Sequence, residues 1–162
     1  MRMKSLTILV CAGLALAACS VSTPSPAPSQ FNTTTSMADV MNRIIDPVAQ
    51  RMLRRSGSID TAEGTKTILP ASDAEWQLAE NEATILIESG NLLLIPSRIK
   101  KLDDKDTDWV KYTNLMVQLA QEERAAIIAK DGDKMFDIGA KIWDEACTGC
   151  HKKYVIPTLP RS

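Results

Sequence analysis

The chain has 162 residues, of which 44% are hydrophobic and 4% aromatic, and its formal net charge is −1. This length suffices for one domain with a hydrophobic core. The nearly balanced charge excludes the basic composition typical of nucleic-acid-binding proteins, so we expect no nucleic-acid partner.

Residues 1–18 predict an export signal. Arg2 and Lys4 precede an apolar run from Leu6 to Leu16, which is the organisation of a signal peptide. The run is shorter than the roughly 20 apolar residues that span a bilayer. The run ends in Leu-Ala-Ala-Cys, which resembles the bacterial lipobox, so we expect a lipid on Cys19. The alternative is an ordinary cleavage site followed by an incidental cysteine.

Residues 19–36 predict a tether between the lipid and the folded domain, because they are rich in Ser, Thr and Pro and lack apolar periodicity. Removal of residues 1–18 also removes Arg2 and Lys4, which leaves 17 basic against 20 acidic side chains, a net charge of −3. Membrane attachment is therefore expected through the lipid and not through a basic surface.

A first helix is predicted from Ser36 to Gly57. Ser36, with Asp39 three residues later, is a variant of the capping box. Pro47 removes the hydrogen bond to the Arg43 carbonyl, so we expect a kink there or a break at Asp46. Apolar residues recur every three or four positions and share one helix face: Met37, Met41, Ile44, Val48 and Met52.

Three further helices are predicted after a polar loop over residues 58–71. The second helix begins at Ser72, with Glu75 in the capping-box position, and is stopped by Pro96. A charged connection over 100–106 precedes the third helix, which ends at Asp131-Gly132. The fourth runs from about Asp133 through His151, and Pro157 and Pro160 keep the tail from continuing as helix. Each helix has one apolar face. The residues are Trp76, Ala79, Ala83, Leu86, Ile87 and Gly90 in the second helix; Trp109, Met116, Leu119, Ala120, Ala126 and Ile127 in the third; and Met135, Phe136, Ile138, Gly139, Ile142, Trp143, Ala146 and Cys150 in the fourth.

Four amphipathic helices with short to moderate connections predict an all-α fold, an antiparallel up-down-up-down four-helix bundle over residues 37–162. Packing of these apolar faces against one another in a core without a cofactor would be enough to explain the pattern. Only a specific motif can therefore indicate a cofactor in the bundle.

That motif is Cys147-Thr148-Gly149-Cys150-His151. C-x-x-C-H is the sequence for covalent attachment of a c-type haem. On a helix, Cys147 and Cys150 share a face and can bond the two vinyl groups of one porphyrin, while His151 brings an imidazole nitrogen to the iron. The expected cofactor is one covalent haem c, with thioethers at Cys147 and Cys150 and His151 as the proximal iron ligand.

Two alternatives for the cysteine pair are a redox dithiol and half of a zinc site. A thioredoxin-like dithiol is expected near a βαβ pattern, which this sequence lacks. A structural zinc site takes about four Cys or His ligands. The other two cysteines are not expected to bind zinc, because Cys11 lies in the removed signal and Cys19 is expected to carry the lipid. His151 is the single histidine, so four ligands are not reached.

A four-helix domain with C-x-x-C-H on its last helix resembles the class II cytochromes c, the cytochrome c′ group. Residues 147–154 resemble the ending of that family, C-x-x-C-H-x-x-aromatic, and the stretches 45–47 and 88–92 resemble a branch of the same group. The resemblance implies haem bound through Cys147, Cys150 and His151. It also allows a homodimer through the first two helices.

The sixth position on the iron has two possible states. In the family that the chain resembles, a residue near the start of the first helix fills the position or leaves it open. In an antiparallel bundle the start of the first helix lies level with the end of the fourth, which places Met41 near the height of His151. Met41 is therefore the candidate distal ligand, with Met37 in reserve. The alternative is that both methionines only fill the core.

These features predict a lipid-anchored monohaem cytochrome that transfers single electrons to a periplasmic or membrane redox partner. It faces the periplasm, and Ser20 after Cys19 favours the outer membrane by analogy with enteric sorting. The alternative is a five-coordinate protein that binds NO or CO as a buffer or sensor. We expect no enzyme, because the sequence offers no distal His or Arg pair for peroxide activation. Lys152 and Lys153 are expected to form a solvated helix end.

Overall fold

The structure is a computed structural model and describes residues 31–155. The expected signal peptide over 1–18, the lipid on Cys19 and the first part of the tether lie outside the described residues. The described residues form a helical unit that begins at Phe31. In the part of the chain that the structure describes, no helix is both long enough and apolar enough to cross a membrane.

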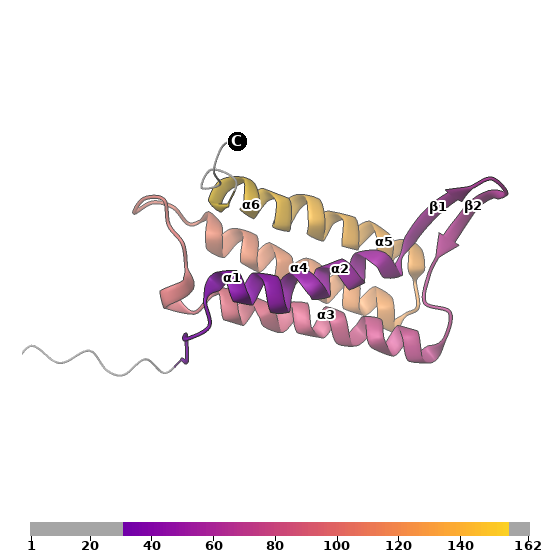
Figure 1. The fold of residues 1–162 in the computed structure, drawn as a ribbon, viewed down its shortest axis with the longest axis horizontal. Helices are drawn as coiled ribbons and strands as arrows, with labels where there is room; N and C mark the ends of the chain where they lie inside the picture. Colours follow the sequence, from indigo (N-terminus) through magenta and orange to yellow (C-terminus); the bar gives the residue numbers. More distant parts are fainter. Residues whose placement is uncertain (1–30, 156–162) are drawn as a thin grey trace, which may run out of the picture. The chain divides into compact units, whose positions relative to one another are not determined.

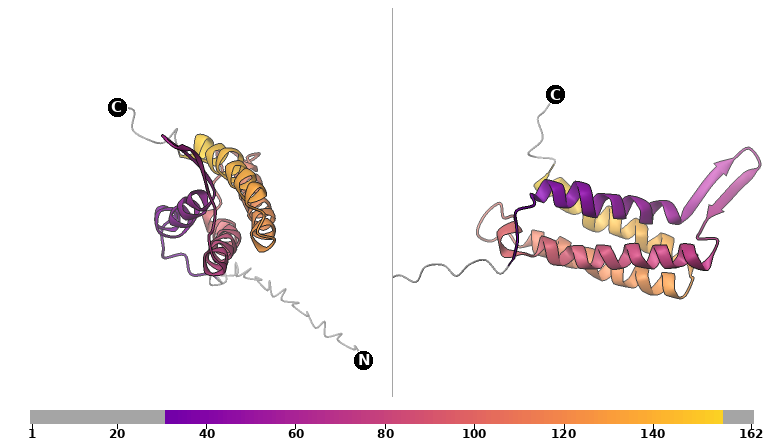
Figure 2. Two further views of the ribbon diagram at one scale, coloured as in Figure 1. Left: turned by 90° about the vertical axis from the view of Figure 1, so that its right-hand side faces the viewer. Right: turned by 60° about the horizontal axis from the view of Figure 1, so that its bottom comes forward.

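Four helical segments run alternately up and down, and neighbours in the chain are antiparallel (Figure 1). An end-on view shows them packed around a common interior (Figure 2). The first segment contains α1 (Met37–Val40), the π-helical η1 (Met41–Ile45) and α2 (Asp46–Arg55); the second is α3 (Asp73–Leu93); the third is α4 (Asp108–Ile128); the fourth contains α5 (Gly132–Lys141), the π-helical η3 (Ile142–Cys147) and α6 (Thr148–Tyr154). The predicted helical bundle is confirmed.

A β-hairpin makes the all-α prediction incomplete. Strands β1 (Gly57–Thr61) and β2 (Gly64–Ile68) pair antiparallel, with Gly57 opposite Ile68 and Thr61 opposite Gly64. The hairpin extends beyond the end of the bundle (Figure 1). The sequence predicts only a polar loop here, because nearly all hairpin residues are exposed and no buried face produces an alternating apolar pattern.

The predicted helix starts follow from side-chain caps. The Ser36 hydroxyl accepts a hydrogen bond from the Asp39 backbone N–H at 3.0 Å, and the Ser72 hydroxyl accepts one from the Glu75 N–H at 3.3 Å. Such bonds satisfy amides that lack an intrahelical partner. Asp131 caps the fourth segment in the same way, with its carboxylate 3.1 Å from the Lys134 N–H.

The first segment stays helical through Pro47. The Asp46 N–H donates to the Met41 carbonyl, five residues back, so a π turn immediately precedes the proline. Proline lacks an N–H, and its ring crowds the carbonyl four residues earlier. A wider turn relieves that crowding without interrupting the helix, so the expected break at Asp46 is wrong.

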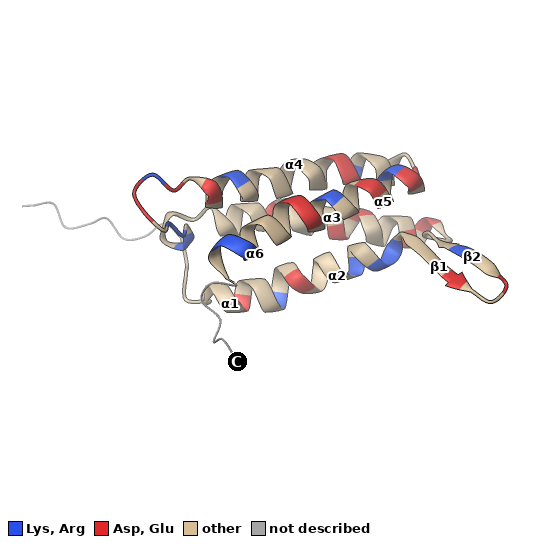
Figure 3. Cartoon of the chain, turned by 90° about the horizontal axis from the view of Figure 1, so that it is seen from above, with Lys and Arg blue, Asp and Glu red and all other residues tan. Residues whose placement is uncertain are grey.

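The core fills the space between the four segments, and most residues of the predicted apolar faces are buried in it, among them Ala79, Ala83 and Leu86 at 0% exposure. Phe136 and Trp143 are exceptions, 48% and 42% exposed. The Trp109 indole N–H donates to the Leu93 carbonyl at 2.9 Å and fixes α4 to the end of α3. Acidic and basic residues are interspersed along the helices drawn in Figure 3, with basic residues at the end of α2 and in α6.

Candidate cofactor site

Cys147, Cys150 and His151 line one cavity of about 390 Å³ between the helical segments. Its volume lies in the range of small-molecule and cofactor sites. The remaining walls are mostly apolar and come from all four segments: Met41, Asn42, Ile45, Asp46 and Ala49 of the first, Leu93 of α3, Tyr112, Thr113 and Met116 of α4, and Trp143, Ala146 and Thr148 of the fourth. The motif therefore faces an interior space that could hold a flat apolar group.

The fourth segment presents the three motif side chains on one face. Cys147 ends η3, and Cys150 and His151 lie in α6, so they occupy positions i, i+3 and i+4. The Thr148 N–H donates to the Trp143 carbonyl, five residues back, so the π turn of η3 ends directly at the motif. π-helical turns are frequent at functional sites, and sequence reasoning did not predict this one.

Both motif cysteines are free thiols and half-buried. Burial raises the pKa of Cys147 to about 11, and the neighbouring Cys150 and Asp46 raise it further in the same direction. Burial likewise raises the pKa of Cys150 to about 11, although Lys100 opposes the shift. A redox dithiol requires a lowered thiol pKa. The electrostatics of this site therefore disfavour the dithiol alternative.

The zinc alternative also lacks support among the described residues. No cluster of three or more His, Cys, Asp or Glu side chains within residues 31–155 is placed to hold a metal ion. Two thiols and one imidazole fall short of the four ligands of a structural zinc site.

The two candidate distal methionines line different cavities. Met41 lines the cavity that contains the motif. Met37 lines a different cavity of about 290 Å³, with Arg98 and Lys100. Met116, which is 5% exposed, also lines the motif cavity. The sequence shows only that Met116 belongs to the apolar face of its helix. Helix periodicity does not show which residues along α4 lie opposite the motif in α6.

Of Tyr112, Phe136 and Trp143, two line the motif cavity. Tyr112 and Trp143 do, whereas Phe136 lies at the other end of the bundle, with its ring close to Gly57. The Tyr112 ring packs against the motif itself, because a Cβ added at Gly149 would lie 2.5 Å from its Cε1 atom. Only glycine leaves room for this ring beside the motif.

Gly149→Ala is expected to displace the Tyr112 ring and to lower the free energy of unfolding. Overpacking of this kind costs about 1–3 kcal/mol, which exceeds the gain of about 1 kcal/mol from replacing a helical glycine by alanine. Denaturant unfolding of the variant tests this. In the double variant with Tyr112→Leu the clash is absent, and the alanine should then stabilise the protein. Destabilisation of equal size in both backgrounds would contradict the proposed contact.

The end of α6 is fixed to the connection before α4 by Asp106, which is buried. Its carboxylate accepts hydrogen bonds from the Tyr154 hydroxyl at 2.8 and 2.9 Å and from the Lys153 ammonium at 2.7 Å. The Lys153 ammonium also lies 2.8 Å from Asp108. These bonds hold the pKa of Asp106 well below its usual range, the one from Lys153 most strongly. Lys153 is therefore bound to acidic side chains, and the expected solvated end is correct only for Lys152, which is exposed.

Tyr154→Phe is expected to lower the midpoint of thermal unfolding, measured by circular dichroism. The change removes the hydroxyl from the buried Asp106 carboxylate and keeps the ring, whose edge contacts Trp109 at a centroid distance of 5.3 Å. Tyr112→Phe is the matched control, since no hydrogen bond of that hydroxyl is found among the described residues. An equal change in both variants would show that the network does not fix α6.

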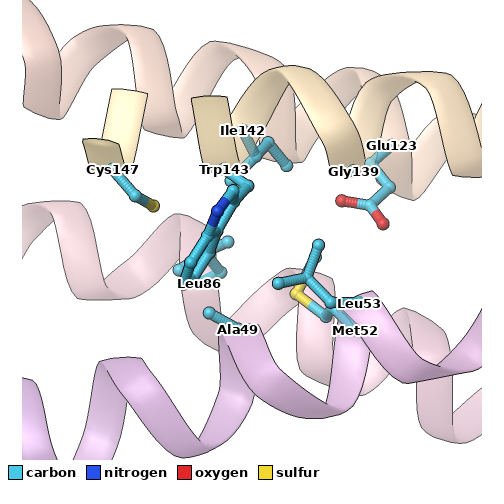
Figure 4. Close-up of a pocket in the computed structure, with 9 residues that line it drawn as sticks. All are labelled: Ala49, Met52, Leu53, Leu86, Glu123, Gly139, Ile142, Trp143 and Cys147. Atoms are coloured by element: carbon cyan, nitrogen blue, oxygen red, sulfur yellow. The ribbon is translucent and has the colours of Figure 1, made fainter. Parts of the chain in front are cut away.

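A second, much smaller cavity adjoins the first and contains a residue that sequence reasoning missed. It has a volume of about 10 Å³, and its lining includes Glu123 of α4 together with Ala49, Trp143 and Cys147, which also line the larger cavity (Figure 4). Glu123 is 1% exposed, and both of its carboxylate oxygens lack a hydrogen-bond partner within the described part of the chain. Its position in the apolar stripe of α4 gave no signal, because charged residues usually mark the solvated face.

Comparisons with protein-family models, with curated proteins and with solved structures give no match for this chain. The functional interpretation rests on its residues and their geometry.

Proposed function

We propose that the protein is a c-type monohaem cytochrome that transfers single electrons. One observation carries the proposal: Cys147, Cys150 and His151 line a single cavity of about 390 Å³, and Met41 lies on its wall. Haem c supplies an iron that accepts and donates one electron.

The residues present fit covalently bound haem. The two cysteines offer unpaired thiols for thioether bonds, and His151 offers an imidazole one position further along the same face. The walls are mainly apolar, as the porphyrin requires, and Gly149 lets the Tyr112 ring close one side. His151 binds the iron on the proximal side in this proposal.

Met41 is the proposed distal ligand. Its thioether lies on the wall of the motif cavity, whereas Met37 lines another cavity. The chain has no second histidine, so two histidine ligands from one chain are excluded. Ligation by His and Met raises the reduction potential of haem iron, which suits an electron carrier.

A second candidate function is reversible binding of NO or CO. The mainly apolar lining of the motif cavity favours it, because Ile45, Ala49 and Leu93 offer no iron ligand and the distal position stays open if neither Met41 nor Met116 binds the iron. A protein of this kind would buffer or sense the gas and would carry no catalytic residues.

The proposed location follows from the first 36 residues. Export and a lipid on Cys19 place the helical unit on the periplasmic side of a membrane, with the outer membrane favoured over the inner. The partner is then a one-electron donor or acceptor in the periplasm or the membrane. The protein is proposed as a carrier and not as an enzyme.

The test is the optical spectrum of the full chain, produced together with haem-attachment machinery and purified in detergent. We expect a haem that stays bound under denaturing conditions, because thioether bonds are covalent. The variant Cys147→Ala/Cys150→Ala should lose this denaturant-resistant haem. A ferrous spectrum unchanged by CO supports electron transfer, and a rapid shift on adding CO supports gas binding. A chain that acquires no covalent haem would overturn both proposals.

A further inference from the structure

We propose that Glu123 is a proton-binding site coupled to the redox cofactor of the adjoining cavity, so that the protein carries a proton together with each electron. The inference rests on the proposed function, because it concerns the group held by Cys147, Cys150 and His151. Glu123 is the one acidic side chain among the described residues that is buried next to the motif cavity and has no hydrogen-bond partner.

The position of Glu123 requires a physical explanation. Its side chain is 1% exposed, and neither carboxylate oxygen has a hydrogen-bond partner among the described residues. Native proteins seldom leave buried polar groups unpaired, because each costs its full desolvation energy. The backbone of α5 passes close to the carboxylate, since a Cβ added at Gly139 would lie 3.4 Å from one of its oxygens. The fold therefore buries an acid where its carboxylate has no hydrogen-bond partner among the described residues.

The carboxylate points into the small cavity that adjoins the motif cavity (Figure 4). Cys147 lies at the opposite end of this space, and the Trp143 indole stands between the two residues. The two cavities share Ala49, Trp143 and Cys147 as lining residues. The residues between Glu123 and the motif cavity are mainly apolar, and electrostatic interactions through such a medium are stronger than in bulk water.

The surroundings of Glu123 leave its charge uncompensated. Apart from Glu123, the Cys147 thiol is the one titratable group in the lining. On neighbouring elements, Glu82 of α3 pairs with Arg51 and Arg55 of α2. Glu80 of α3 pairs with Arg124 of α4, whose buried Nε has no hydrogen-bond partner among the described residues. The other charged residues on the adjacent elements are exposed: Glu122 on α4, Asp133, Lys134, Asp137 and Lys141 on α5, and Asp144 and Glu145 on η3.

Burial raises the pKa of Glu123 to about 8. The carboxyl group therefore titrates near neutral pH, where a small change in the local charge changes its proton occupancy. Leu53 is half-buried and Trp143 is exposed, so the side of the cavity that they form lies next to solvent, from which a proton can come.

The coupling balances charge and atoms. The cofactor carries one positive charge more when oxidised, which favours the Glu123 carboxylate. When an electron arrives from the one-electron redox partner, that charge is lost, and the carboxylate binds one proton from solvent to become a carboxylic acid. Loss of the electron to an acceptor reverses the change. No covalent bond other than the O–H bond forms or breaks.

The test is the reduction potential of the full haem-loaded chain in detergent between pH 6 and pH 9.5. In the parent protein we expect the potential to fall as the pH rises, by about 59 mV for each tenfold difference in proton affinity between the two redox states. Glu123→Gln keeps the side-chain volume and removes the titration, so its potential should change much less. Glu122→Gln, at an exposed neighbouring carboxylate, is the matched control and should behave as the parent protein does.

A second measurement keeps the proposal testable if Glu123→Gln folds poorly. The infrared difference spectrum of the parent protein, reduced minus oxidised, should show a new C=O stretch of a protonated carboxyl group. A potential independent of pH, with no such band, would overturn the coupling while leaving the proposed cytochrome intact. A pH dependence unchanged in Glu123→Gln would assign the proton to another group. A chain without covalent haem would fail the proposed function itself, and the optical spectrum reports that failure separately.

Discussion

Met41→Leu is expected to convert a low-spin, six-coordinate haem into a high-spin, five-coordinate one. Met41 is the methionine near the start of the first helical segment that lines the motif cavity, and leucine has nearly the same volume but no sulfur. Loss of the thioether should also lower the reduction potential, on the order of 0.1 V within the roughly 0.8 V range that axial ligands span. Optical spectra of both oxidation states and a redox titration measure the two effects.

Met116→Leu is the matched control. Met116 lines the same cavity from α4 and is buried, so the substitution perturbs packing to a similar degree, at less than about 1.5 kcal/mol. It should leave the haem low-spin. If Met41→Leu stays low-spin and Met116→Leu becomes high-spin, the distal ligand comes from α4. If the parent protein is already high-spin and binds CO, gas binding replaces electron transfer as the better proposal.

Glu123→Gln is expected to change how stability depends on pH. A buried acid whose pKa rises from 4.5 in the unfolded chain to about 8 in the folded one binds a proton more tightly when folded. Its stabilising contribution is fully present below pH 4.5 and is lost as the pH rises towards 8, by about 1.4 kcal/mol per pH unit and about 5 kcal/mol at most. Glutamine does not titrate, so the variant should lack this loss and should exceed the parent protein in stability at pH 8.5.

Urea unfolding at pH 5.5, 7.0 and 8.5 measures the expected loss in the parent protein and in Glu123→Gln. Glu122→Gln provides the comparison for removal of a negative charge from the exposed side of α4. Parallel pH profiles for Glu123→Gln and the parent protein would show that the carboxyl group of Glu123 is paired or hydrated in solution.

The helices could be predicted because their signals are local. Ser36 and Ser72 cap their helices through backbone amides three residues away, and these contacts depend only on adjacent sequence. The hairpin between Gly57 and Ile68 was missed because its residues are solvent-exposed on both faces, and an apolar period never arises. The π turn before Pro47 was missed because propensity shows that a proline disturbs a helix but not how the backbone responds.

The candidate site was predictable only in part for the same reason. The spacing of Cys147, Cys150 and His151 is fixed by the chemistry of attachment, and the antiparallel order of the segments placed Met41 on the wall of the motif cavity. The contact of Tyr112 with Gly149 and the positions of Met116 and Glu123 depend on the axial position of α4 relative to α6 and α5. That position is a property of packing between distant segments, and no periodicity within one helix reports it.

The two π turns change the helical register of the segments that contain them. A bond that reaches back five residues encloses one residue more than a bond that reaches back four, and one residue corresponds to about 100° of rotation. The turns at η1 and η3 lie in the two segments whose ends meet around the motif cavity. Each turn therefore changes which residues of the following helix share a face with residues of the preceding helix. At η1, Val48 and Met52 can face the core while Met41 faces the cavity. Deleting one residue from either turn would remove this extra residue and leave a regular α-helix.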